Sequence, residues 1–334
     1  MSEPEGLPAR TRGPVRELGE CAQGETDQVS PFADPAAPAV DLLRTVSHEY
    51  GLSAPISVER LTGGYANDVF LLRGDRSVVL HVKHPPLDLE GLFWEHQLLE
   101  LLRPHLSEIP GPLRTLDGRT FLLHRERPLW LTPYAPGVPA KPGDRRAVAA
   151  ALGRLHDVQL DMSPRPGHSR LSDLPFPPLG QMPRAFECWL PLIADARQEA
   201  IELIARTART RKITRGVTHN DIFPGNVLLQ DGQVTALLDW EEADLDWLVW
   251  DLACSMGPFC STPAGDLDIS AKQDFLDSYR AASGRVPPEE DDLIVPLLRV
   301  KRILEVLRAP TDRHPRWEYQ LENLRAYQLL SSIG

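Results

Sequence analysis

The stretch of the chain that decides the fold is "THNDIFPGNVLL", from Thr218 to Leu229. His219, Asp221 and Asn226 lie close together in it, and their side chains are of the types that hold a metal ion or exchange a proton. The stretch then ends in plain apolar residues that are typical of a strand. A polar loop that runs directly into a strand indicates that the strand brings a further polar side chain back beside the loop.

A tight hairpin is predicted directly after this polar loop. Apolar runs at 227–229 and 234–238 flank an Asp-Gly pair, which is a strong signal for a two-residue turn. Because a hairpin returns the chain to where it started, we expect Asp239 beside Asp221 and Asn226 despite their separation in sequence. Three oxygen-bearing side chains then converge on one point.

Such a set of side chains suits phosphoryl transfer. Mg²⁺ favours carboxylate and carbonyl oxygens and completes its coordination with water and phosphate. Asp221, at the tight start of the loop, can face a substrate hydroxyl while its neighbours hold a metal ion beside it. The pattern therefore predicts a base for a hydroxyl nucleophile next to a magnesium site.

The rest of the chain divides into a β-rich first third and an α-rich remainder. Residues 1–36 are rich in Pro, Gly, Glu and Ser without a periodic apolar pattern, which predicts a disordered tail. Over residues 37–134, aliphatic and β-branched runs between glycine turns predict five strands, with a first helix over 41–50 and the main helix over 89–102. Helical periodicity dominates residues 135–334. We therefore expect a nucleotide-binding N-lobe and a larger C-lobe that carries the catalytic loop and the substrate site.

These motifs together resemble the aminoglycoside phosphotransferase, choline kinase and homoserine kinase superfamily, the small-molecule branch of the protein-kinase-like fold. The resemblance covers about residues 41–310 and rests first on "THNDIFPGNVLL" and "ALLDWEEADLDWLVWDLA". The pieces "LTGGYANDVFLL", "VVLHVK", "WEHQLLELL" and "GRLHD" support it. It implies an α+β, bilobal fold with a small antiparallel-sheet N-lobe, one main N-lobe helix and an α-rich C-lobe.

The resemblance also assigns the charged groups of the reaction. Asp221 corresponds to the catalytic base that orients the acceptor hydroxyl, and Asn226 and Asp239 correspond to the Mg²⁺ ligands. Lys83, in the third strand, corresponds to the lysine on the α- and β-phosphates of ATP, with GTP as an alternative nucleotide. Glu95, on the following helix, corresponds to the ion-pair partner that aims Lys83.

Three residues around the loop are expected to support it. By the same resemblance, His219 is a structural histidine that fixes the loop backbone, and Asp251 is a buried aspartate that braces it. Much of the superfamily has glycine at the position of Asn220. Asparagine tolerates unusual φ angles better than most residues, so we expect the loop to form normally.

Backbone groups of the N-lobe are expected to contact the nucleotide. By the same resemblance, Thr132 and Tyr134 fall where the interlobe segment meets the base. Because Pro133 between them has no N–H, the Thr132 carbonyl and the Tyr134 amide are the groups expected to make the contact. Gly63 and Gly64 are expected to let backbone N–H groups approach phosphate, although the full G-x-G-x-x-G pattern is missing.

Charge limits the partners of the protein. The net charge of −11, from 36 basic and 47 acidic residues, argues against nucleic acid or an anionic membrane as a partner. Glu241 and Glu242 are the residues expected to face a cationic substrate, although a solvated acidic loop over a tryptophan-lined core explains the same pattern. No apolar run is long enough for a membrane span and no signal-peptide core is visible, so we expect a cytoplasmic protein. The oligomeric state is left open.

The expected activity is that of an ATP- and Mg²⁺-dependent kinase acting on a hydroxyl of a small molecule. The arginine-rich composition, with 32 prolines, is typical of GC-rich bacteria. Together with the habits of the superfamily it favours a natural-product antibiotic, through a sugar or aminocyclitol hydroxyl, as the acceptor. A metabolic kinase of homoserine, choline or an amino sugar is the alternative within the class. A pseudokinase-like module that binds nucleotide without transfer is the alternative from another class.

Overall fold

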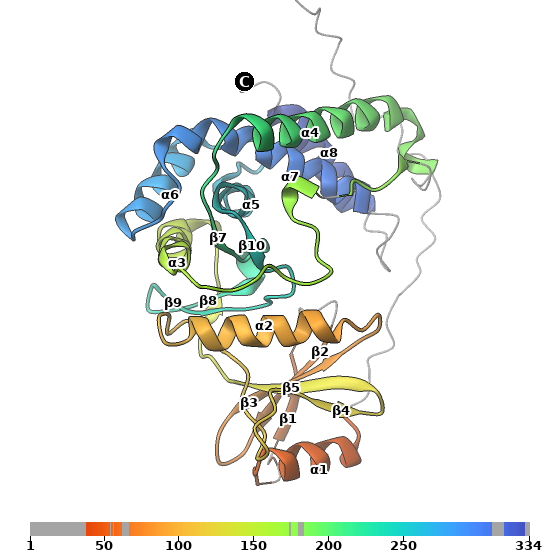
Figure 1. The fold of residues 1–334 in the computed structure, drawn as a ribbon, viewed down its shortest axis with the longest axis vertical. Coiled ribbons are helices and arrows are strands. Elements are labelled where there is room, and N and C mark those ends of the chain that lie inside the picture. Colours follow the sequence, from red (N-terminus) through yellow and green to blue (C-terminus); the bar gives the residue numbers. More distant parts are fainter. Residues whose placement is uncertain are drawn as a thin grey trace, which may run out of the picture.

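The structure is a computed structural model that describes residues 38–53, 55, 57–61, 67–173, 175–179, 184–308 and 317–330. The tail predicted over residues 1–36 and the two glycines Gly63 and Gly64 lie outside these residues. The described chain forms two lobes, with the N-lobe at the bottom and the C-lobe at the top of Figure 1.

The N-lobe is built on one antiparallel sheet in the order β1-β2-β3-β5-β4. Phe70, Leu80 and Leu131 of the sheet share a buried cluster with the helix α1, Val40–Glu49, which covers one face (Figure 1). The register of β2 and β3 places Asn67 opposite Lys83. The five predicted strands are thereby confirmed as β1 Ser57–Arg60, β2 Asn67–Arg73, β3 Val78–Lys83, β4 Leu122–His124 and β5 Arg127–Pro133.

The helix α2, Leu89–Leu102, lies between the sheet and the C-lobe (Figure 1) and matches its predicted range. Asp88 caps it by accepting a hydrogen bond from the Gly91 N–H at 2.8 Å. Its buried apolar side chains, among them Trp94 and Leu98, belong to the same core cluster as the C-lobe helices. The helix therefore packs on the C-lobe core through these side chains and on the N-lobe sheet through His96, whose ring lies against Trp130 of β5.

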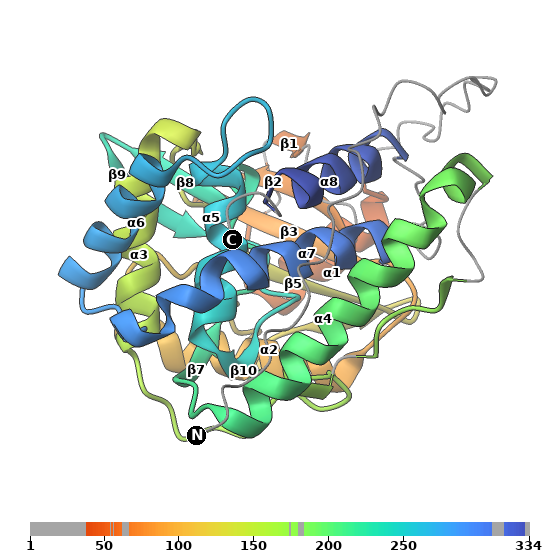
Figure 2. The ribbon, with the colours of Figure 1, turned by 90° about the horizontal axis from the view of Figure 1, so that it is seen from above.

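The C-lobe is formed mainly by helices. Seen from above, α4 and α7 run side by side across it, and α8 packs on α7 (Figure 2). Trp247, Phe259 and Phe275 are buried in its core. Among the described residues, no helix has the length and apolar character that a bilayer crossing needs. The helices are α3 Arg145–Asp157, α4 Leu190–Thr210, α5 Leu248–Cys260, α6 Ile269–Ala281, α7 Ile294–Arg308 and α8 Trp317–Leu330.

A small sheet in the C-lobe contains the predicted hairpin. It consists of β8, Val227–Gln230, and β9, Gln233–Leu237, with β6, Val138–Pro139, on the other edge of β8. The turn residues Asp231 and Gly232 have φ angles of 52° and 75°, the left-handed geometry of a two-residue hairpin turn. The hairpin prediction is confirmed.

A second small sheet closes the loop that carries the candidate site. It pairs β7, Arg215–Thr218, with β10, Asp244–Trp247, in antiparallel register, and Thr218 lies opposite Asp244. Neither strand was predicted from the sequence. Because the two strands are paired, the whole segment between them is held closed at its base.

Candidate active site

The loop between β7 and β8 holds Asp221 against Asn226. The Asn226 amide nitrogen donates to the main-chain oxygen of Asp221 at 3.0 Å and to its carboxylate at 2.9 Å. This arrangement fixes Asp221 and leaves the amide oxygen of Asn226 for a cation. Burial raises the pKa of Asp221, although the charges of Lys301 and His219 act to lower it. Asp221 is therefore a positioned group that can orient a hydroxyl and accept its proton.

Asp239 reaches the same region from the end of the β8–β9 hairpin. The Leu238 N–H donates to the Asn226 carbonyl at 2.8 Å, which joins the two halves of the site. Asp239 has a φ of 62°, a conformation that a non-glycine residue adopts only where its surroundings impose it. Part of the residue is exposed, yet protein atoms crowd the carboxylate. This desolvation, together with the charges of Glu241 and Asp221, raises the pKa of Asp239 to about 7.

This donor set fits a hard divalent cation. The carboxylates of Asp221 and Asp239 and the amide oxygen of Asn226 are of the type that Mg²⁺ prefers. The raised pKa of Asp239, due first to desolvation by the protein atoms around its carboxylate and then to nearby carboxylates, shows that a cation at this position would be stabilised. In the described part of the chain, no three His, Cys, Asp or Glu side chains are already gathered as metal ligands. A metal ion here would complete its coordination with phosphate and water.

His219 supports the catalytic loop from inside. Its Nε2 lies 3.0 Å from the Leu238 carbonyl oxygen, and its Nδ1 accepts a long bond of 3.4 Å from the Asp221 N–H. The proton therefore sits on Nε2, and burial lowers the pKa of the ring, which keeps it neutral. The ring is fully buried beside Trp240. Its contacts join the loop to the end of the hairpin, and none of them faces a substrate.

Asp251, on α5, anchors the backbone of the loop. It is completely buried and accepts hydrogen bonds from the N–H groups of His219 at 2.7 Å and Asn220 at 2.8 Å. His156 lies 3.1 Å from the same carboxylate and is itself held by the Tyr279 hydroxyl at 2.8 Å. Burial acts to raise the pKa of Asp251, but its hydrogen bonds and the neighbouring His156 hold that pKa below the usual value. The carboxylate is a charged clamp for the loop.

Asn220 has a φ of 65°, in the left-handed region that the glycine of the superfamily motif permits. Asparagine adopts this conformation more readily than most residues, as the sequence predicts. Its side-chain amide donates to the Glu242 carbonyl at 2.8 Å. The residue therefore also joins the catalytic loop to the segment that follows Asp239.

Lys83 is buried at the end of β3 and has a different partner from the one expected. Its Nζ lies 2.9 Å from a carboxylate oxygen of Glu241, two residues beyond Asp239. Within the described residues, no ion pair joins Lys83 to Glu95. Glu95 is buried, and one of its oxygens has no hydrogen-bond partner. Burial, followed by the charge of Glu241, raises the pKa of Glu95 to about 8. Glu241 replaces Glu95 as the counter-ion because its side chain extends from the C-lobe to the N-lobe sheet.

Thr132 and Tyr134 lie at the end of β5, where the chain leaves the N-lobe. Thr132 is buried, and its hydroxyl lies 3.1 Å from Nε2 of His81 on β3. The Tyr134 N–H donates to the Ser77 carbonyl over 3.4 Å, a long bond that a nucleotide base can replace. Their contact with a nucleotide base stays a prediction.

A pocket of about 40 Å³ opens beside the catalytic loop in the C-lobe. Glu242 lines it, as expected for a residue that faces the substrate, whereas the Glu241 carboxylate is used by Lys83. The lining combines both signs of charge, with cations from α7 and carboxylates from β10 and the loop before it. The charged and polar lining residues are His168, Ser169, Asn220, Glu242, Asp244, Asp246, Lys301 and Arg308.

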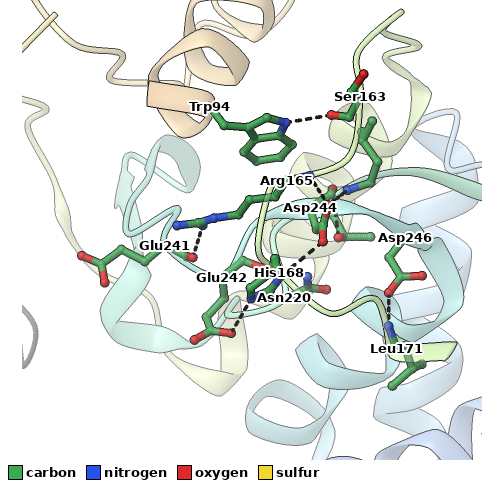
Figure 3. Close-up of polar contacts among 12 residues, drawn as sticks. Trp94, Ser163, Arg165, His168, Leu171, Asn220, Glu241, Glu242, Asp244 and Asp246 are labelled. Carbon is green, nitrogen blue, oxygen red and sulfur yellow. Dashed lines mark hydrogen bonds and ion pairs between the residues drawn. The ribbon is translucent and has the colours of Figure 1, made fainter. Parts of the chain in front are cut away.

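The segment 163–171, which we call the strap, runs along β10 and was not predicted to belong to the site (Figure 3). The Arg165 N–H donates to the Asp244 carboxylate at 3.0 Å, and the Leu171 N–H donates to the Asp246 carboxylate at 2.6 Å. Both carboxylates are buried and hydrogen-bonded, so this part of the acidic stretch is not a solvated loop. The alternation of polar and apolar residues in β10 was the available signal for a strand here.

Comparisons of the sequence with known proteins agree with this geometry. The model of a family described as "Phosphotransferase enzyme family" matches residues 57–293. The homoserine kinase of Nitrobacter winogradskyi is 26% identical over 306 residues, which cover 85% of this chain and 90% of that protein. The homoserine kinase of Granulibacter bethesdensis is 26% identical over 260 residues, which cover 75% and 79% respectively.

Solved structures share the fold at lower sequence identity. A microcompartment-associated aminopropanol kinase superposes with a TM-score of 0.70 at 16% identity, covering 87% of this chain and 95% of that one. An amicoumacin kinase in complex with AMP-PNP and Ca²⁺ superposes with a TM-score of 0.68 at 16% identity, covering 88% and 93%. The predicted bilobal, protein-kinase-like fold is confirmed.

Proposed function

Because the chain belongs to the phosphotransferase enzyme family, we propose that it transfers the γ-phosphoryl group of ATP to a hydroxyl of a small molecule with Mg²⁺ as the metal ion. The observation that carries this proposal is the arrangement of Asp221, Asn226 and Asp239 in one loop-and-hairpin unit. The hydrogen bonds of Asn226 to Asp221 and of Leu238 to Asn226 hold that unit together. Lys83 faces it from the other lobe through Glu241.

Asp221 prepares the acceptor. The hydroxyl oxygen attacks the γ-phosphorus, the bond from that phosphorus to the bridging oxygen of the β-phosphate breaks, and the hydroxyl proton passes to the Asp221 carboxylate. Burial raises the pKa of Asp221, which makes the carboxylate a better proton acceptor than a free aspartate. The two bonds from Asn226 keep the carboxylate aimed, so catalysis rests on positioning.

The remaining groups hold the phosphates. Asn226 and Asp239 would hold Mg²⁺, which neutralises charge on the transferring phosphoryl group when it is bound. Lys83 would contact the non-reacting phosphates as a compact point charge. His219 and Asp251 make no such contact, and they fix the loop from which Asp221 acts.

A small hydroxy amino acid of the homoserine type is the acceptor that we favour. The relatives found by sequence comparison are homoserine kinases. An amino acid carries an ammonium and a carboxylate, and the pocket beside the catalytic loop has Glu242 for the first and Lys301, which also pairs with Glu305 at 2.7 Å, for the second. The pocket volume of about 40 Å³ is small for a molecule of antibiotic size.

A cationic natural-product antibiotic is the second candidate. It is supported by Glu242 in the pocket and by the net charge of −11. A pocket of about 40 Å³ must widen to admit either acceptor, and a bulky antibiotic requires the larger displacement of the strap.

An acceptor panel tests the activity and separates the two candidates. Release of ADP from MgATP is measured with homoserine, amino alcohols, choline and aminocyclitol antibiotics, with Asp221→Asn as the inactive control. Turnover of homoserine but not of the antibiotics supports the first candidate, and the reverse result, with protection of a sensitive host, supports the second. Consumption of ATP that Asp221→Asn does not reduce contradicts the proposed mechanism.

Two substitutions in the pocket test the acceptor assignment itself. Glu242→Gln and Lys301→Gln are each expected to raise KM for a hydroxy amino acid while KM for ATP stays unchanged. An unchanged acceptor KM in both variants contradicts the assignment of this pocket.

A further inference from the structure

The counter-ion of Lys83 is held by two groups of the N-lobe at once. One carboxylate oxygen of Glu241 lies 2.9 Å from the Lys83 ammonium and accepts a hydrogen bond of 2.5 Å from the Asn67 side chain. Asn67 and Lys83 lie opposite each other on β2 and β3, so the carboxylate closes against the end of the strand pair. The Lys83 side chain is 10% exposed and that of Glu241 is 23% exposed. Water therefore screens this pair much less than a surface ion pair.

The backbone of Glu241 is anchored separately from its carboxylate. The Arg165 guanidinium donates to the main-chain oxygen of Glu241. Figure 3 shows the Glu241 carboxylate directed away from this contact. Arg165 is held in turn by Asp88 at the start of α2, at 3.6 Å. A change at the carboxylate can therefore occur by side-chain rotation while the main chain stays in place.

The strap fixes Arg165 to both lobes. The Trp94 indole on α2 donates to the Ser163 carbonyl at 2.7 Å, at one end of the strap. The Arg165 and Leu171 N–H groups bond the carboxylates of β10, as Figure 3 shows. The segment that carries Arg165, which holds the Glu241 main chain, is therefore itself fixed by hydrogen bonds to α2 and β10.

Lys83 has a second carboxylate available. Glu95 on α2 is buried, and one of its oxygens has no hydrogen-bond partner. The negative charge of Glu241 raises the pKa of Glu95, and the positive charge of Lys83 lowers it. A buried oxygen without a partner is costly, and a contact with the Lys83 ammonium would satisfy it.

We propose that Glu241 is an internal competitor of nucleotide phosphate at Lys83. This inference rests on the proposed function. It means that the nucleotide phosphate must displace the Glu241 carboxylate before Lys83 can contact the nucleotide. Asn67 and Arg165 hold the blocking state, and Glu95 takes over as the partner of Lys83 once Glu241 has left. The competing carboxylate lowers the observed nucleotide affinity by the fraction of molecules in which Lys83 is free. If about one molecule in ten is free, removal of the carboxylate strengthens binding about tenfold.

Nucleotide binding to the full-length protein tests this inference. The Kd for ADP and for a non-hydrolysable ATP analogue is measured by calorimetry, with and without Mg²⁺, for wild type, Glu241→Gln and Glu241→Ala. Glu90→Gln, which removes the same charge from the exposed side of α2, is the matched control. Both Glu241 variants are expected to bind nucleotide about tenfold tighter, with or without Mg²⁺, and the control is expected to match wild type.

The outcomes separate this inference from the proposed function. Unchanged nucleotide affinity in both Glu241 variants overturns the inference, and so does weaker binding. Weaker binding seen only with Mg²⁺ would assign Glu241 to the metal ion instead. Absence of nucleotide binding in wild type would contradict the proposed function, which needs no particular role of Glu241. A tenfold gain in Glu90→Gln as well would show a general charge effect and would also overturn the inference.

Discussion

Substitution of Asp251 by asparagine is expected to loosen the catalytic loop without touching a substrate. The carboxylate accepts three hydrogen bonds, from the N–H groups of His219 and Asn220 and from His156, and it is fully buried. An asparagine side chain offers one acceptor oxygen in place of two. If that oxygen serves His219 and His156, the new NH₂ group faces the Asn220 N–H, and two donors meet without an acceptor.

The size of the effect follows from this count. A buried donor left without a partner costs about 1–3 kcal/mol, and the remaining bonds lose the extra strength that a charged acceptor gives. We therefore expect Asp251→Asn to lower the free energy of unfolding by about 2–4 kcal/mol. Asn220 keeps its φ of 65° partly through this bond, so its release shifts Asp221. A displacement on the order of 1 Å at a catalytic group can cost about 100-fold in rate, and we expect a loss of kcat of about 10- to 100-fold.

Denaturant unfolding and steady-state kinetics measure the two effects separately. Glu290→Ala is the matched control, because Glu290 is another buried acid of the C-lobe and accepts the two bonds of Thr214 away from the site. The control is expected to lose stability but to keep the kcat of the wild type under conditions where it is folded. If Asp251→Asn loses stability and retains kcat within about twofold of wild type, the clamp does not position Asp221. If its stability does not change, the assigned hydrogen bonds are wrong.

Four further results are expected. Asp221→Asn should lower kcat by about 100- to 10,000-fold with little change in KM for ATP, measured by steady-state kinetics, because it removes the proton acceptor but no phosphate contact. Mg²⁺-dependent nucleotide binding should weaken by about tenfold per pH unit below a pH of about 7, measured by calorimetry, because the proton on Asp239 must leave before the metal binds. Glu95→Gln should gain stability over wild type as the pH rises from 4.5 towards about 8, measured by thermal midpoints, because a carboxyl whose pKa is raised on folding destabilises the protein across that window. Asn220→Ala should cost about 1–2 kcal/mol in denaturant unfolding because of its left-handed φ, whereas Asn220→Gly should cost less.

The elements that were predicted from the sequence are those whose signal is local. The helix 89–102 has an uninterrupted apolar pattern with Asp88 before it, and the hairpin around Asp231 and Gly232 has its own turn residues. The pair of β7 and β10 was missed because each strand is four residues long and 25 residues, 219–243, separate them. The sequence of neither strand indicates which other strand it pairs with. Strand pairing of this kind depends on the surrounding fold.

Contacts between side chains of the two lobes were harder to predict from the sequence than the strand pairs. The chain shows a lysine on a strand and a glutamate on the next helix, and the resemblance to the superfamily implied the pair of Lys83 with Glu95. Which carboxylate reaches Lys83 depends on the relative position of the two lobes, and Glu241 reaches it here. Arg165 stands in a proline-rich segment without a periodic signal, so its contact with Glu241 could be found only in three dimensions.

The packing of α2 explains why the counter-ion of Lys83 can change. The apolar side of α2 belongs to the C-lobe core through Trp94 and Leu98, whereas Lys83 belongs to the N-lobe sheet. Glu95 is therefore fixed to the C-lobe core, and the distance from its carboxylate to the Lys83 ammonium depends on how the sheet sits on α2. Glu241, from the C-lobe, makes the contact with Lys83 in this structure. The proposed exchange of Glu241 for Glu95 would therefore require the Lys83 ammonium and the Glu95 carboxylate to come together, and this depends on how the sheet sits on α2.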